Sequence, residues 1–336
     1  MLAFQVIFMY NICVDVFSIK SFKRRSPMEE FNLISFDGTD IHCYMWNNVE
    51  NPKAVVQIAH GMGEHCGRYD DFASFLNKNG YIVIAEDHRG HGKTCGYEKR
   101  GIVEGDSYND TISDMIALTN NYAIKKYKLP VVLVGHSYGS FLSQGYIERN
   151  GDALAGVILS GSAYMNTAQV AFGRVVASIQ NALCGGEKPA NLIAKLSFGA
   201  YDKQFKEENQ PFAWLTRDKE VVKKYIADEY CGAAFNMSIA FQKSFFYGMK
   251  TVYRPESLKA IPKELPVFIA SGDRDPVGGN GALVSRLYEE YKALGLTDLD
   301  IKLYPDARHE ILNELNKDEV YSDFLAFIDR VTAPKE

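Results

Sequence analysis

Residues 129–147, LPVVLVGHSYGSFLSQGYI, join an apolar run to a helical pattern through a turn with a serine between two glycines. The run VVLVG is typical of a buried strand, and the residues from about 137 to 149 are typical of a helix. On so sharp a turn Ser137 projects its hydroxyl clear of the backbone, and Gly135 and Gly139 relieve the crowding. The N–H groups that open the helix point to the same place. The stretch therefore predicts an α/β fold with Ser137 as a nucleophile; the alternative is an ordinary glycine-rich turn.

A serine needs a base to take its proton, and in this architecture an acid and then a histidine follow the serine along the chain. Of the seven histidines only His309 lies downstream of Ser137, in the loop DARHE before the last predicted helix. The strand before it ends in SGDRDPV, which offers Asp273 and Asp275. Position alone does not separate these two carboxylates. The proline after Asp275 stiffens the local backbone, which favours Asp275 as the acid.

A second glycine-rich stretch, IAHGMGEHCGRY at residues 58–69, allows two interpretations. Glycines on both sides of Met62 let its N–H turn toward the serine, and the Tyr138 N–H supplies a second donor for an oxyanion. The same glycines are also typical of a dinucleotide-binding unit of an oxidoreductase. That motif requires a glycine where the chain has Cys66, and it leaves Ser137 unexplained. The oxyanion loop is therefore the preferred interpretation.

The rest of the chain alternates predicted strands and helices. FNLISF and IHCYMW flank the turn DGTD and predict a hairpin. Further strands are predicted at AVVQIA, YIVIA, AGVILS, LPVFIAS and DIKLYP, with helices near 69–79, 107–127, 279–294 and 313–331. This rhythm favours a mostly parallel, doubly wound sheet. It stops between 162 and 255, which predicts a core of residues 28–161 and 256–336 with a helical cap (lid) over 162–255.

Composition narrows the class of protein. The 336 residues are 46% hydrophobic and 24% charged, which is an ordinary globular balance. The net charge is −5 and no basic tract is present, so a nucleic-acid partner is not expected. Six scattered cysteines suit reduced thiols. The histidines between 60 and 91 lie on two loops without ligand spacing, so we expect no metal and no cofactor.

Residues 1–27 fit neither a signal peptide nor a clear membrane span. Their apolar part contains Gln5, Asn11 and Asp15 and is followed by KSFKRR. The charge order and cleavage site of a secretory signal are not evident, and about 20 apolar residues are needed to span a bilayer. Two interpretations stay open, a leader outside the fold and a membrane-associated segment. The expected location is cytoplasmic, with membrane association as an option.

With these motifs in hand, the chain resembles a known family. HGMGEHCGRY, DHRGHGKT, GHSYGS, SGDRDPVGG and PDARHEILNE follow in that order. The chain is thereby similar to the monoacylglycerol lipase, lysophospholipase and serine-aminopeptidase-like group of α/β hydrolases, over about residues 30–330. The resemblance implies an α/β-hydrolase fold with a cap. It also implies site residues, namely Ser137 as nucleophile, Asp275 as acid, His309 as base, and Met62 and Tyr138 as oxyanion donors.

The expected function is hydrolysis of carboxylic esters, of the monoacylglycerol or lysophospholipid type, through an acyl-enzyme on Ser137. An aminopeptidase or amidase of the same fold and a noncatalytic binding protein are the alternatives. Peripheral membrane contact through the cap or the N-terminal segment is a further option, and the oligomeric state stays open. A few apolar side chains of the cap are expected to line an acyl slot, drawn from Phe172, Phe198, Phe212, Trp214, Phe241, Phe245, Phe246 and Met249.

Overall fold

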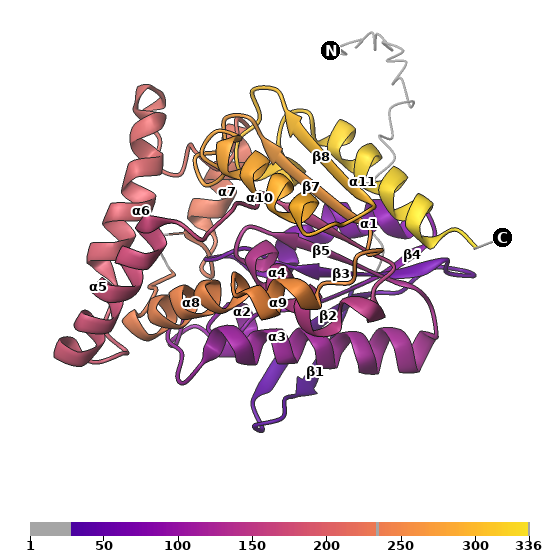
Figure 1. Ribbon diagram of the computed structural model, residues 1–336, viewed down its shortest axis with the longest axis horizontal. Helices are drawn as coiled ribbons and strands as arrows, with labels where there is room; N and C mark the ends of the chain where they lie inside the picture. Colours follow the sequence, from indigo (N-terminus) through magenta and orange to yellow (C-terminus); the bar gives the residue numbers. More distant parts are fainter. Residues whose placement is uncertain (1–27, 233–234, 335–336) are drawn as a thin grey trace, which may run out of the picture.

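The computed structural model describes residues 28–232 and 235–334, so the predicted leader, residues 1–27, lies outside the described residues. The strands form one eight-stranded sheet in the order β1-β2-β4-β3-β5-β6-β7-β8 (Figure 1). β1 pairs antiparallel with β2, and β2 with β4, whereas the other neighbours pair parallel. The strands are β1 (Met28–Ile34), β2 (Asp40–Trp46), β3 (Ala54–Ala59), β4 (Tyr81–Glu86), β5 (Val131–His136), β6 (Gly156–Ser160), β7 (Val267–Gly272) and β8 (Leu299–Tyr304). The predicted hairpin and mostly parallel sheet are both confirmed.

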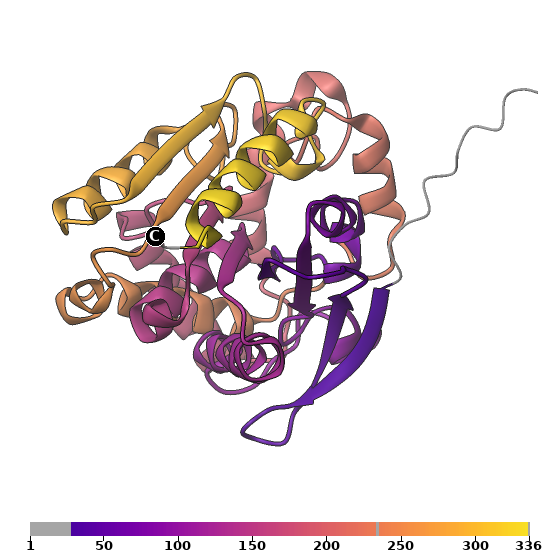
Figure 2. The ribbon, with the colours of Figure 1, turned by 90° about the vertical axis from the view of Figure 1, so that its right-hand side faces the viewer.

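Helices cover both faces of the sheet, because the central parallel strands are apolar on both sides. Successive residues of β5 point to opposite faces: Leu133 belongs to one buried cluster and Val132 and Val134 to the other. The first face packs against α3 (Ser107–Leu118), α4 (Tyr138–Asn150), α9 (Pro255–Ala260) and α10 (Ala282–Ala293). The second face packs against α1 (Asp70–Lys78) and α11 (Lys317–Thr332). Figure 2 shows the sheet twisting from the β1–β2 hairpin to β7 and β8.

The helix predicted over residues 107–127 differs from the prediction in its second half. α3 is α-helical only to Leu118, and a π-helix follows over Thr119–Lys125. At this junction the Thr119 hydroxyl and the Gln57 side-chain amide both donate to the Met115 carbonyl oxygen, each at 3.0 Å. Side chains that compete for a helix carbonyl disturb the regular hydrogen-bond pattern. Because Gln57 belongs to β3, the helical periodicity of the segment could not reveal the change.

The segment between β6 and β7 is largely helical. We call residues 162–255 the insertion. It contains α5 (Ala168–Cys184), α6 (Asn191–Gln204), α7 (Lys219–Ala227) and α8 (Ile239–Val252). α8 packs against α3 and α4, while α5 and α6 lie at the far side of the molecule from α11 (Figure 1). Gly173 lets α5 approach α8 closely, because a Cβ there would come within 2.6 Å of the Phe246 ring.

A membrane span needs about 20 mostly apolar residues. Within residues 28–232 and 235–334, none of the helices combines that length with enough apolar character.

Candidate active site

Ser137 stands at the turn from β5 to α4 in a strained backbone conformation. Its φ is 51° and its ψ is −117°, a region that non-glycine residues seldom adopt. Gly135 and Gly139, two residues before and after Ser137, have no room for a side chain. A Cβ on Gly139 would clash with the Ala59 carbonyl oxygen, and one on Gly135 would come within 2.6 Å of the Gly139 carbonyl oxygen. The predicted sharp turn is confirmed, and it places the Ser137 side chain beyond the carboxyl end of β5.

The structure brings the side chains of Ser137, His309 and Asp275 together. The distance from His309 Nε2 to Ser137 Oγ is 2.8 Å, and the distance from His309 Nδ1 to Asp275 Oδ2 is 2.9 Å. Asp275 also accepts hydrogen bonds from the Ser271 hydroxyl at 3.0 Å and from the Val277 N–H at 2.8 Å. His309 and Asp275 are both buried. The three side chains form a continuous hydrogen-bonded array, from a hydroxyl through an imidazole to a carboxylate.

The charges of the array favour an imidazole that accepts a proton. Burial acts to lower the pKa of His309, but the Asp275 carboxylate outweighs it and raises the pKa above its ordinary value. Burial acts to raise the pKa of Asp275, but His309 and the hydrogen bonds from Val277 and Ser271 bring it below the usual range. An ionised Asp275 keeps a proton on Nδ1 of His309 and leaves Nε2 as the acceptor facing Ser137. This arrangement can take the proton of the serine hydroxyl.

Asp273, the rival carboxylate, is not part of the array. Its backbone N–H donates to the Tyr304 carbonyl oxygen at 3.1 Å. The next N–H, of Arg274, donates to the Ala307 carbonyl oxygen at 3.0 Å. The turn after β7 is thereby tied to the loop after β8, and it carries Asp275 rather than Asp273 to the histidine.

Met62 and Tyr138 line the same pocket as Ser137 and His309. Tyr138 is the first residue of α4, so its N–H has no acceptor within the helix. In the loop after β3 the Gly61 N–H is already engaged, because it donates to Glu64 Oε1 at 2.6 Å. Met62 is the next residue along the loop, so its N–H comes directly after a backbone N–H that is already hydrogen-bonded.

Three charged residues at the site escaped the sequence analysis, namely Glu64, Arg68 and Glu310. Arg68 donates to both carboxylate oxygens of Glu310, at 2.9 and 2.8 Å, and also pairs with Glu64. Tyr69 donates to Glu64 Oε1 at 2.7 Å. All three residues lie inside the motifs HGMGEHCGRY and PDARHEILNE, so the sequence did mark them as candidates for the site. Their pairing was not visible, because Arg68 and Glu310 are 242 positions apart.

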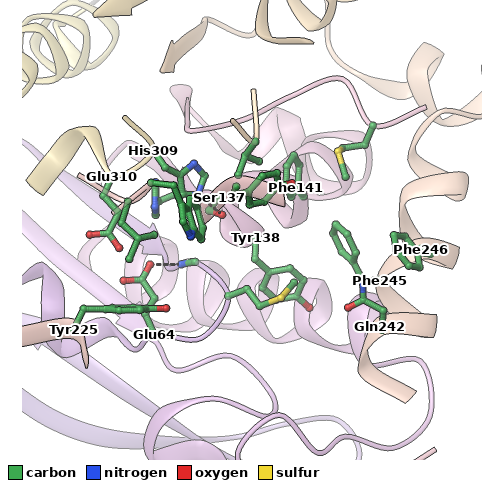
Figure 3. Close-up of a pocket in the computed structure, with 18 residues that line it drawn as sticks. Glu64, Ser137, Tyr138, Phe141, Tyr225, Gln242, Phe245, Phe246, His309 and Glu310 are labelled. Carbon is green, nitrogen blue, oxygen red and sulfur yellow. Dashed lines mark hydrogen bonds between the residues drawn. The ribbon is translucent and has the colours of Figure 1, made fainter. Parts of the chain in front are cut away.

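The pocket has two chemically different sides, with Ser137 between them (Figure 3). Glu64, Tyr225 and Glu310 lie on one side, whereas Phe245, Phe246 and Gln242 lie on the other. Phe141 and Met165 add apolar surface to the lining. The polar side carries the paired charges described above, and the other side is mostly apolar.

The insertion contributes directly to the site. The His309 N–H points to the Trp214 carbonyl oxygen at 3.4 Å, and the Glu310 N–H donates to the Leu215 carbonyl oxygen at 2.7 Å. Of the eight apolar side chains expected to line an acyl slot, Trp214, Phe245 and Phe246 line the pocket. Phe172 does not line it and is 62% exposed. The others outside the lining are Phe212, Phe241 and Met249, and the side chain of Phe198 lies outside the described residues.

The sheet order, together with a Ser–His–Asp array at the carboxyl ends of its strands, defines the α/β-hydrolase class. Residues 50–316 match the family Hydrolase_4, described as serine aminopeptidase, S33, and the chain belongs to this family.

Known relatives and solved structures agree with this class. The chain is 28% identical to a monoacylglycerol lipase of Mycolicibacterium smegmatis over 90% of its length and 98% of the relative's. It is 28% identical to the human monoglyceride lipase over 90% and 91%. A thermostable carboxyl esterase of Bacillus coagulans, solved with glycerol, superposes with a TM-score of 0.84 at 26% identity, over 91% of this chain and 99% of the esterase. The protein is a carboxylic-ester hydrolase.

Proposed function

We propose that Ser137 is the nucleophile, His309 the general base and Asp275 the residue that orients the base. The observation that carries this proposal is the continuous array, with 2.8 Å between Ser137 and His309 and 2.9 Å between His309 and Asp275. A hydroxyl, an imidazole and a carboxylate in this order form the working unit of serine hydrolases. The ionised Asp275 stabilises the imidazolium that forms when His309 takes the proton.

We propose that the backbone N–H groups of Met62 and Tyr138 hold the oxyanion. Tyr138 is supported by its place at the start of α4, where the helix leaves its N–H without an internal partner. Met62 is supported by its loop, in which Gly61 lies beside Ser137 and has its own N–H taken by Glu64. Donors fixed in advance stabilise the charge of the tetrahedral intermediate at little cost of reorganisation.

The reaction then follows in two halves. Ser137 Oγ attacks the ester carbonyl while its proton passes to His309 Nε2, and the tetrahedral intermediate expels the alcohol, which takes that proton. The acyl group remains on Ser137. Water attacks this acyl-enzyme with His309 again as the base, and the product acid leaves as the serine regains its proton.

The preferred substrate in this proposal is a lipid with one acyl chain on a small polar alcohol, a monoacylglycerol or a lysophospholipid. The two sides of the pocket support it. Phe141, Phe245 and Phe246 offer apolar contact for the acyl chain. Glu64 and Glu310, on the other side, offer hydrogen-bond acceptors for hydroxyl groups. The names of the relatives from M. smegmatis and human point to the same substrate class.

An aminopeptidase or amidase activity is the second candidate, because the matched family carries that description. Such an enzyme needs an acidic group to receive the substrate's ammonium. The nearby carboxylates, Glu64 and Glu310, are both engaged by the Arg68 guanidinium. Arg68 thus cancels one of the two negative charges and occupies oxygens of both carboxylates, which favours a neutral alcohol over a cationic amine at this side of the pocket.

We propose further that the insertion acts as a lid that also meets the lipid surface. Its backbone closes over the site through Trp214 and Leu215. On its outer helix α5, the apolar side chains of Phe172, Val175, Ile179 and Leu183 are exposed. Their spacing of three to four residues places them on one helical face. A membrane-associated cytoplasmic enzyme with a lipid substrate would use such a face to take the lipid from the bilayer.

Ser137→Ala tests the proposal, with turnover of monoacylglycerol, lysophospholipid and aminoacyl amides measured side by side. We expect the variant to keep its unfolding temperature, to resist labelling by a fluorophosphonate probe and to lose at least about 10⁴-fold in ester turnover. Ser140→Ala is the matched control, because the Ser140 hydroxyl donates to the Ser137 carbonyl oxygen rather than to His309. Retained labelling or turnover in Ser137→Ala would refute the role of Ser137. Amide turnover exceeding ester turnover in the unmodified enzyme would favour the second candidate.

A further inference from the structure

A second cluster of reactive side chains lies outside the pocket, where the insertion meets the core. It consists of His65, at the end of the loop that carries Met62, and of Asp228 and Cys231, which follow α7 in the insertion. One side-chain atom of each residue, a nitrogen, an oxygen and a sulfur, lies within 4.8 Å of the other two. His65 and Asp228 are partly exposed, whereas Cys231 is buried behind them.

The hydrogen bonds of the cluster converge on one carboxylate. The distance from His65 Nε2 to Asp228 Oδ2 is 3.0 Å, and the Tyr230 N–H donates to Asp228 Oδ1 at 2.8 Å. The Cys231 thiol is a third donor to Asp228. Burial acts to raise the pKa of Asp228, but these hydrogen bonds outweigh it and lower the pKa. Two of the three donors, the imidazole and the thiol, are groups that a metal ion can bind in place of a proton.

We propose that His65, Asp228 and Cys231 bind one divalent transition-metal ion of the zinc class, with water as the fourth ligand. Imidazole nitrogen, thiolate sulfur and carboxylate oxygen are the three ligand types that Zn²⁺ prefers. On binding, Cys231 gives its proton to solvent, and the His65 proton moves from Nε2 to Nδ1. The affinity therefore rises with pH, because the thiol must lose its proton before the metal ion can bind.

The geometry requires only small movements. A tetrahedral zinc ion, with bonds of about 2.0–2.3 Å, holds its ligand atoms roughly 3.2–3.8 Å apart. The 3.0 Å separation of His65 and Asp228 is already close to this range, and the Cys231 sulfur, within 4.8 Å of both, needs to approach by no more than about 1.5 Å. The shift of the His65 proton gives up the long hydrogen bond of 3.2 Å that Nδ1 accepts from the Gly67 N–H.

The surroundings provide an entry path for a cation. His65 and Asp228 line a surface groove whose wall also carries four carboxylates, those of Asp70, Asp71, Asp218 and Glu220. The cations in the wall are Arg68, Lys224 and Lys317. With Asp228, five carboxylates thus face three cations, so the groove attracts positive ions.

Another group with metal-ligand side chains, His60, Cys66 and Asp87, lacks the exposure and the exchangeable hydrogen bonds of the His65–Asp228–Cys231 cluster. It is completely buried. Asp87 already accepts hydrogen bonds from the Tyr44 hydroxyl and from the N–H groups of Cys66 and Lys93. His60 Nε2 accepts the His88 N–H at 2.9 Å. A metal ion there would have to replace bonds that hold the core.

A metal ion bound by His65, Asp228 and Cys231 would join the insertion to the loop that carries Met62. The two are already in contact there, because the Gly232 N–H donates to the Gly63 carbonyl oxygen at 3.1 Å. The ion would add three bonds across the same boundary, one from the loop and two from the insertion. We therefore expect it to stabilise the folded protein and to restrict movement of the insertion. The site does not depend on the role of Ser137.

The test is a zinc titration of the full chain after removal of metal, in competition with a chromophoric zinc chelator. We expect one Zn²⁺ per chain in the sub-micromolar range, a raised unfolding temperature, and no comparable effect of Mg²⁺. Co²⁺ in place of Zn²⁺ should give a thiolate charge-transfer band and the strong visible absorption of a tetrahedral site.

Cys231→Ala and Asp228→Asn should each lose the site, whereas Cys184→Ala, which removes an exposed thiol elsewhere in the insertion, should retain it. Asp228→Asn is the conservative variant in case Cys231→Ala folds poorly. Absence of stoichiometric zinc binding to the unmodified chain, or binding that survives in Cys231→Ala, overturns the proposal. Loss of binding in Cys184→Ala would equally overturn it. If Ser137→Ala failed to abolish turnover, the catalytic role of Ser137 would be refuted but the zinc titration would be unaffected. The two proposals are therefore tested independently.

Discussion

At the scale of single residues, the site depends on a few backbone positions that only particular residues can occupy. Ser137 adopts a positive φ of 51°, and Gly139 lies where any side chain would meet the Ala59 carbonyl oxygen. Strain of this kind persists only where the surrounding structure enforces it. The strained turn keeps the hydroxyl beside His309.

Asp275→Asn tests the orienting role at this scale. Asparagine fills the same space but can no longer stabilise an imidazolium or fix the Nδ1–H tautomer. We expect turnover of a short-chain ester to fall by about 10⁴-fold, with little change in KM. Asp273→Asn is the matched control, since that carboxylate is not bonded to the histidine, and it should retain most of the activity. Equal losses in both variants would contradict the assignment of Asp275.

The pH dependence of activity follows from the same pair. Only neutral His309 can take a proton, and Asp275 raises the pKa of His309 above the ordinary value of 6.5. Activity is therefore lost as the pH falls through a value higher than 6.5, and it returns as the pH rises through it. The measurement is kcat/KM of an uncharged ester against pH. A midpoint at or below that of a free histidine would show that the ion pair does not act as described.

At the scale of elements, the site is assembled from loops at the carboxyl ends of parallel strands. Met62 follows β3, Ser137 follows β5, Asp275 follows β7 and His309 follows β8. These ends lie at the same edge of a parallel sheet, so four short loops suffice. Arg68 then joins the first of these loops to the last through Glu64 and Glu310.

Arg68→Leu tests this connection between loops. Removing the guanidinium leaves two buried carboxylates without their cation, which costs about 3–5 kcal/mol in the free energy of unfolding. Urea unfolding should show this loss, and the activity per folded molecule should also fall because the loop that carries Met62 loses its anchor. Lys93→Leu, which removes an exposed ion pair with Glu30, is the control and should cost about 1 kcal/mol or less. Similar losses in the two variants would argue against a special role for Arg68.

At the scale of the whole molecule, the insertion supplies part of the pocket lining and presents an apolar face outward. Four exposed apolar side chains follow one side of α5. Beside them Arg174 and Lys243 lie over the ring of the exposed Tyr247, at 5.5 and 5.9 Å from its centroid. Aromatic and basic groups around an apolar stripe are typical of surfaces that meet a bilayer.

Phe172→Ser combined with Leu183→Ser tests the membrane contact. Each change removes roughly 1.5–3 kcal/mol of apolar transfer free energy if the side chain is fully inserted. We expect binding to mixed phosphatidylcholine and phosphatidylglycerol vesicles to weaken by tenfold or more, measured by co-sedimentation, while turnover of a water-soluble ester stays unchanged. Ile34→Ser removes an exposed apolar side chain from β1 instead. If it weakens binding as much, the contact does not lie on α5.

Much of the fold was predictable because its signals are local. The buried strands are short apolar runs, so AVVQIA gave β3 with both ends correct, and the hairpin turn DGTD lies between β1 and β2. The two elements that differed from the prediction, the end of α3 and the start of β1, involve contacts with residues that are distant in the sequence. The end of a predicted α-helix is a π-helix, and it begins where Gln57 and Thr119 hydrogen-bond the Met115 carbonyl oxygen. Met28 pairs with Trp46, so β1 begins three residues before the predicted strand.

By itself, the sequence determined the order of strands and helices, the turn at Ser137 and the choice of His309, since chain order left a single histidine downstream of the serine. The tertiary structure decided which of two aspartates meets that histidine, which aromatic side chains face the pocket, and that Arg68 joins two distant loops. It also brought His65 beside Asp228 and Cys231. The physical reason is range: backbone preferences and hydrophobic periodicity act between neighbours in the chain, whereas hydrogen bonds and ion pairs depend on distances that exist only after the chain has folded.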